Sequence, residues 1–140
     1  MLVEKAVLKN LWCIRLNPGD DVFLSLSEAV KKHGINNALI ISAAGSSANY
    51  HFHVVASPQF PPENIFVKGD KASDVLTLSG VIINGRVHAH ISHGDKDNAY
   101  GGHLEAGVKV LTFMSIALAE VDLDLDNWDA VGKIEEYRKN

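Results

Sequence analysis

The stretch LTLSGVIINGRVHAHISHGDKDNAYGGHLEAG, residues 76–107, decides the fold. An Asn-Gly pair at positions 84 and 85 separates two runs in which apolar and polar residues alternate, and this pattern predicts a hairpin with a two-residue turn. A turn of that length sets the register, so Val81 should face His88 and Ser79 should face His90. Because strand side chains alternate between faces, the two histidines point together, away from an apolar face formed by Leu76, Leu78, Gly80, Ile82, Val87, Ala89 and Ile91.

The sequence before this stretch predicts further strands and one helix. Asp20 or Asp21 should cap a helix whose apolar residues, from Val22 to Val30, recur at helical spacing, and Gly34 should end it. We expect strands at residues 6–16, 37–44 and 48–56, with Gly45-Ser46-Ser47 breaking the chain between the last two, and a short edge strand at residues 65–67.

The sequence after it permits two interpretations. Residues 103–119 can form one helix or two strands about Gly107, and Thr112, Phe113 and Ile116 modestly favour strands. Residues 128–140 form a weakly amphipathic tail. About seven strands with so few helices predict an α+β fold, mainly antiparallel sheet with one or two helices, in a single domain over residues 1–140.

Charge and cysteine content indicate which cellular compartment and which binding partners to expect. Asp plus Glu number 17 and Lys plus Arg number 13, so the net charge of −4 disfavours a polyanionic partner such as DNA. Cys13 is the single cysteine, which excludes an intrachain disulfide and favours a reducing compartment. No signal peptide or membrane-length apolar run is evident, so we expect a cytoplasmic protein with no membrane contact.

Three histidines form the candidate metal site: His88, His90 and His103. Alternate residues of a strand lie about 6.6–6.8 Å apart along it, close enough for two imidazoles to converge on one ion. Gly101-Gly102 would let the backbone approach closely and bring the His103 ring over the same face. Three imidazoles suit zinc or another transition metal. The alternative is a pair of solvated histidines with no ligand.

Several neighbours are candidates for supporting roles. Ser79 would lie behind the metal ligands, Arg86 could hold a carboxylate or phosphate, and Glu105 could act as a general base, although an ordinary surface carboxylate is the simpler interpretation. His93 is an alternative third ligand, although an exposed loop residue is the simpler expectation. The remaining residues of this kind have plainer expectations: His51 and His53 as a wall of a cleft or interface, and Asp95 and Asp97 as turn-forming residues.

The segments RLNPGDDVFLSL, IISAAGSS, TLSGVI, HAHIS and GGHLEAG together resemble the PPC domain family (plants and prokaryotes conserved) over residues 11–120. The resemblance implies an antiparallel sheet with one or two helices, a homotrimer, and a histidine cluster at His88, His90 and His103 that holds zinc in several members. Bacterial and archaeal members are commonly labelled putative DNA-binding proteins. The chain departs from the family pattern at Ser46-Ser47-Ala48 and at His51 and His53.

Three functions therefore compete. The first is a DNA-associated trimer, which the family label favours and the charge opposes. The second is a metal-dependent enzyme or small-ligand-binding protein that uses the three histidines, with no catalytic residue or substrate assigned. The third is an oligomerisation module with a structural metal, for which the apolar run at residues 108–119 would supply a subunit contact.

Overall fold

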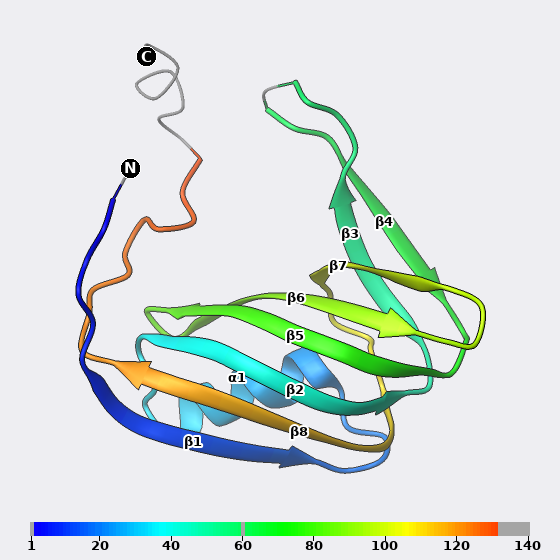
Figure 1. Cartoon of the computed structure of the whole chain (residues 1–140), viewed down its shortest axis with the longest axis horizontal. Coiled ribbons are helices and arrows are strands. Elements are labelled where there is room, and N and C mark those ends of the chain that lie inside the picture. The colour runs from blue at the N-terminus through cyan, green and yellow to red at the C-terminus, as the bar shows by residue number, and fades with distance from the viewer. Residues whose placement is uncertain (1, 60, 132–140) are drawn as a thin grey trace.

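The computed structural model describes residues 2–59 and 61–131, which form one antiparallel sheet of eight strands and one α-helix (Figure 1). The strand order is β1-β8-β2-β5-β6-β7-β3-β4. The elements are β1 (Leu8–Leu16), α1 (Val22–Lys32), β2 (Ala38–Ser47), β3 (Tyr50–Val55), β4 (Asn64–Gly69), β5 (Ser73–Ile83), β6 (Arg86–Gly94), β7 (Ala99–Leu104) and β8 (Val110–Val121). None of the described helical segments has the length and apolar character that crossing a bilayer requires. Most of the predicted tail, from residue 132 on, lies outside the described residues.

Helix α1 forms where the sequence predicted it. The Asp21 carboxylate accepts a hydrogen bond of 3.1 Å from the Leu24 amide, which satisfies one of the free donors at the helix start. Gly34 adopts a φ of 64° just after the last turn, a conformation that glycine takes at little cost. Val22, Leu26 and Val30 are buried, and they join the core beneath the sheet.

The β5–β6 hairpin has the predicted turn and register. Asn84 and Gly85 take φ values of 48° and 75°, and Val81 pairs with His88 while Ser79 pairs with His90. The prediction that Leu76 lies on the apolar face is wrong. The register shifts between Val75 and Thr77, so Leu76 is the extra residue of a bulge and turns outward, 57% exposed.

Two further expectations are settled by strand pairing. Gly45 does not break β2, which continues to Ser47. Its φ of 155° and its close approach to the carbonyl of Phe113, where any Cβ would collide, let β2 follow β8 through an irregular register. Residues 103–119 form strands rather than one helix, with Gly107 between the end of β7 and the start of β8.

The two faces of the sheet differ sharply. Helix α1 covers one face of the central strands, as Figure 1 shows, and the buried side chains of those strands point toward it. His88, His90 and a set of exposed apolar side chains alternate with these buried residues and therefore lie on the other face. The apolar residues are Leu39, Ile41, Leu76, Leu111 and Phe113.

Candidate metal centre

Three histidines form a row across three neighbouring strands. His103 on β7 pairs directly with His90 on β6 and with His53 on β3. Its ring centroid lies 4.4 Å from that of His53 and 5.5 Å from that of His90. His88, two residues before His90, has its ring centroid 4.9 Å from that of His103. Four imidazoles from separate parts of the chain therefore lie together, with His103 at the centre.

The double glycine before His103 makes this row possible. A Cβ on Gly101 would collide with the carbonyl oxygen of Ile91, and a Cβ on Gly102 would collide with that of His53. Only glycine leaves room for the backbone of β7 to approach both neighbours this closely. The predicted role of the Gly-Gly pair is thus confirmed on both flanks of the strand.

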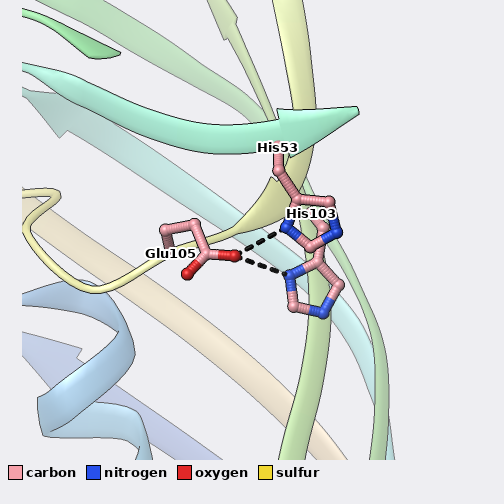
Figure 2. A group of neighbouring side chains, drawn as sticks. All are labelled: His53, His103 and Glu105. Carbon is pink, nitrogen blue, oxygen red and sulfur yellow. Dashed lines mark hydrogen bonds and ion pairs between the residues drawn. The ribbon is translucent and has the colours of Figure 1, made fainter. Parts of the chain in front are cut away.

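Glu105 completes a compact group with two of the histidines (Figure 2). Its Oε1 lies 2.6 Å from Nδ1 of His53 and 3.6 Å from Nδ1 of His103. One ligand atom from each of these three residues lies within 4.8 Å of the others. Two imidazoles and a carboxylate are a ligand set that zinc accepts. Nδ1 of His103 is buried and has no hydrogen-bond partner among the described residues.

The environment keeps the central imidazoles neutral. Burial lowers the pKa of His103, the neighbouring histidines lower it further, and Glu105 opposes them. Burial and the charges of His88 and His53 likewise lower the pKa of His90. A neutral imidazole has the free lone pair that a metal requires, so the shifts favour the metal-binding form near neutral pH.

Arg86 holds a carboxylate of this chain, and Ser79 lies opposite His90 as predicted but makes no contact, in the part of the chain that the structure describes, that would support a ligand. Arg86 Nη2 donates to both carboxylate oxygens of Asp129, at 3.0 and 2.8 Å, so its guanidinium already has a carboxylate partner within the chain. Oδ2 of Asp129 also lies 2.7 Å from Nδ1 of His88. The His88 hydrogen bond, followed by Arg86, lowers the pKa of Asp129. Ser79 is exposed, and among the described residues its hydroxyl makes no hydrogen bond to a histidine.

The two histidines of β3 make different contacts. His53 joins the cluster, whereas His51 bonds through Nδ1 to the carbonyl of Ala106 at 2.7 Å and lines a small pocket with Lys68 and Gly107. Sequence reasoning did not place His53 in the site, because the pairing of β3 with β7 joins segments about fifty residues apart. No local pattern signals that pairing.

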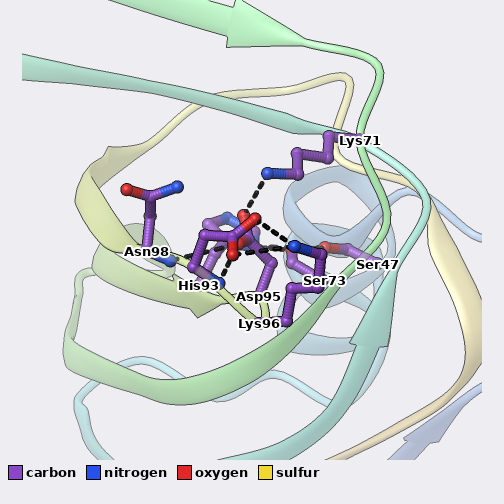
Figure 3. A network of polar contacts seen from close by, with 8 residues as sticks. Ser47, Lys71, Ser73, His93, Asp95, Lys96 and Asn98 are labelled. Carbon is purple, nitrogen blue, oxygen red and sulfur yellow. Dashed lines mark hydrogen bonds and ion pairs between the residues drawn. The ribbon is translucent and has the colours of Figure 1, made fainter.

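His93 was expected in an exposed loop, and this is wrong. Its side chain is fully buried on the α1 side of β6, in the same alternation as Val87, Ala89 and Ile91. Nδ1 lies 3.1 Å from the hydroxyl oxygens of both Ser47 and Ser73, within the network of Figure 3. Burial lowers the pKa of His93 to about 4. The alternation of β6 was the signal that could have placed it correctly.

Asp95, in the same network, forms a turn. Asp95 accepts hydrogen bonds from the amides of Asp97 and Asn98, at 2.8 and 3.1 Å. Its other oxygen forms an ion pair of 2.6 Å with Lys71. The role predicted for Asp95 is confirmed by these contacts.

Comparison with solved structures shows the same fold elsewhere. A plant- and prokaryote-conserved protein of Pyrococcus horikoshii superposes with a TM-score of 0.74 at 21% identity, covering 89% of this chain and 87% of that one. A metal-containing protein of Archaeoglobus fulgidus gives 0.68 at 26% identity, covering 85% of each chain. A protein of Bacteroides thetaiotaomicron named a putative DNA-binding protein gives 0.71 at 16% identity, covering 85% of this chain and 86% of that one.

Sequence comparison points the same way. A bifunctional protein GlmU of Synechococcus is 26% identical over 108 residues, which are 76% of this chain and 16% of that protein. The chain thus spans about a sixth of the curated relatives that it matches. The family model of the Plants and Prokaryotes Conserved (PCC) domain, also written PPC, matches residues 4–122. This chain belongs to the Plants and Prokaryotes Conserved domain family.

Proposed function

We propose that this protein binds a transition metal ion of the zinc class in the histidine cluster and presents it to a small ligand. His88, His90 and His103 are the proposed ligands, and His53 and Glu105 flank His103 on its other side. The observation that carries the proposal is the position of His103, whose ring has three other imidazoles within 5.5 Å. A metal held by three imidazoles can polarise an oxygen of a bound ligand.

The cluster offers donor atoms for such an ion. Ligand atoms of His53, His103 and Glu105 lie within 4.8 Å of one another, and His88 and His90 stand outside that group with ring centroids 4.9 and 5.5 Å from that of His103. The Nδ1 atom of His103, 3.6 Å from Oε1 of Glu105, is buried without a hydrogen-bond partner among the described residues, and a buried polar atom of that kind is costly unless something else binds it. His53, His88 and His103 are half-buried, with side chains between 18 and 29% exposed, and His90 is exposed, so a small molecule can reach them from solvent. A relative of 26% identity is a metal-containing protein.

The proposal includes a homotrimer, as the family resemblance implies. Large apolar side chains are exposed on the face away from α1, among them Phe113, which is 44% exposed, and Ile41, which is 55% exposed. A second copy of the chain is an occupant that would cover them. Light scattering on the purified protein tests the trimer, and a monomer at micromolar concentration would contradict it. A cytoplasmic location remains a prediction.

DNA binding is the second candidate, because two structural relatives are named putative DNA-binding proteins. The charge opposes it, since duplex affinity is built from Lys and Arg contacts with phosphates and this chain carries a net charge of −4. Duplex binding measured against salt concentration separates the candidates. Tight binding that weakens steeply with salt would favour DNA over a small ligand.

Metal content is the direct test of the first candidate. We expect the purified protein, after exposure to zinc and removal of excess, to hold about one ion per chain. His103→Ala should lose most of this metal, and His51→Ala, which removes a nearby imidazole outside the cluster, should retain it. Equal metal content in the two variants, or none in the parent protein, would overturn the proposal.

A further inference from the structure

The chain that follows the sheet returns to the histidine cluster. Strand β8 ends at Val121, and the next residues fold against the β5–β6 turn. Leu125 is 1% exposed and packs with Ile83 and Val121 in a small second core. The side-chain amide of Asn84 donates a hydrogen bond of 3.2 Å to Oδ1 of Asp126. These contacts fix residues 122–130, which we call the return segment.

The return segment delivers one carboxylate to the site. Asp129 is 18% exposed in its side chain, and its Oδ2 lies 2.7 Å from Nδ1 of His88. The guanidinium of Arg86 binds both of its oxygens. A carboxylate held by a guanidinium is ionised and fixed in orientation, and the positive guanidinium balances much of the negative charge of the carboxylate. Asp129 is therefore better suited to orient His88 than to bind a metal itself.

This contact lies beyond the region that the family model describes. The family match ends at residue 122, so Asp129 lies seven residues past it while His88 lies within it. The partners are 41 residues apart in sequence. In this chain, the carboxylate therefore comes from outside the matched region and its histidine partner from inside it.

We infer that Asp129 is a positioning residue of the metal site, acting through His88. When Asp129 accepts the hydrogen bond from Nδ1–H, the neutral ring carries its proton on Nδ1 and leaves the lone pair on Nε2 free for an ion. Glu105 stands in the same relation to Nδ1 of His53 on the opposite flank of His103. The inference rests on the proposed metal binding for its consequence, but the tautomer itself can be measured without metal.

Asp129→Asn removes the charge with little change of shape, and Asp122→Asn is the matched control, at an exposed residue of the same segment. We would record nitrogen-15 imidazole spectra of both variants and the parent protein, free of metal and above the ordinary histidine pKa of about 6.5. His88 should be in the Nδ1–H form in the parent and in Asp122→Asn. In Asp129→Asn it should shift toward the Nε2–H form that free imidazole favours. An unchanged His88 tautomer in Asp129→Asn would overturn the inference.

Metal affinity gives the second measurement. Competition with a chelator for cobalt should show a loss of affinity of about 10- to 100-fold in Asp129→Asn, the range typical of removing an orienting partner, and no loss in Asp122→Asn. A purely structural role would lower the unfolding midpoint without changing affinity or tautomer. If the parent binds metal and Asp129→Asn binds it equally, the inference fails and the proposed function stands. If the parent binds no metal, the proposed function fails, and the tautomer spectra alone decide whether Asp129 orients His88.

Discussion

The buried histidine of β6 should make this fold sensitive to mild acid. His93 has a pKa lowered from 6.5 to about 4, because its ring is fully buried among Tyr50, Phe52 and Tyr100. The folded protein therefore binds a proton at this position more weakly than the unfolded chain does. Stability from His93 is complete above a pH of about 6.5 and is lost as the pH falls toward about 4.

The size of the effect follows from that difference in pKa. Between about pH 7 and about pH 5 the unfolded chain takes up a proton on this residue while the folded protein remains mostly neutral there. The linked loss in the free energy of unfolding is about 2 kcal/mol, and it reaches about 3 kcal/mol by about pH 4. A loss of that size is a large share of the stability of a domain of this length.

The assay compares the parent protein with His93→Gln, which keeps a group that can bond to Ser47 and Ser73 but does not titrate. Urea unfolding of both, with chelator present, should give a parent curve that loses about 2 kcal/mol more than the variant between about pH 7 and about pH 5. Burial also lowers the pKa values of His90 and His103, but both proteins retain these residues, so their contribution cancels. His93→Phe is a second non-titrating variant. Parallel pH dependences for the parent and both variants would refute the reasoning.

Three further predictions concern the helix cap, the hairpin and the metal. Asp21→Ala removes the carboxylate that accepts hydrogen bonds from the backbone amides of Leu24 and Gly107. Denaturant titration should show a free energy of unfolding lower by about 1–2 kcal/mol. An unchanged value would mean that solvent replaces both hydrogen bonds. Gly80 has a φ of 151°, and Gly80→Ala would place a Cβ against the carbonyl of His88. Melts followed by circular dichroism should therefore show that the free energy of unfolding falls by more than about 2 kcal/mol. A melt like the parent's would count against the close approach of the two strands. Zinc at about a hundredfold excess over its dissociation constant should stabilise the parent by about 2.7 kcal/mol. It should give little stabilisation to His103→Ala, and equal shifts would place the ion elsewhere.

Local chemistry made much of the fold predictable. The helix has its cap at Asp21 and its stop at Gly34, and the hairpin has its turn residues at Asn84 and Gly85, so in each case a few neighbouring residues determine the backbone. The bulge that turns Leu76 outward has no comparable signature. Its cause is the register of β5 against β6, which is not evident from the hydrophobic pattern alone.

The candidate site was predictable only along single strands. His88 and His90 share a face by alternation, and the double glycine indicated that His103 would approach them. His53 enters through the pairing of β3 with β7, and Asp129 enters through the return segment, and both contacts are made by segments far apart in the chain. Such contacts depend on the tertiary arrangement, and periodicity in the sequence carries no information about them.

The β3–β4 hairpin is joined to the rest of the sheet through a short seam. Strand β3 pairs with β7 at Phe52–Leu104 and His53–His103, with one further bond of 3.1 Å from the Glu105 amide to the His51 carbonyl, whereas β6 pairs with β7 from His90 to Gly94. Local opening at this seam would part His53 from His103 without unfolding the central strands. A ligand that binds both the His53 and the His103 ring would hold the two strands together at this seam. Hydrogen exchange of the β3 and β4 amides should then be slower when the ligand is bound than when it is absent.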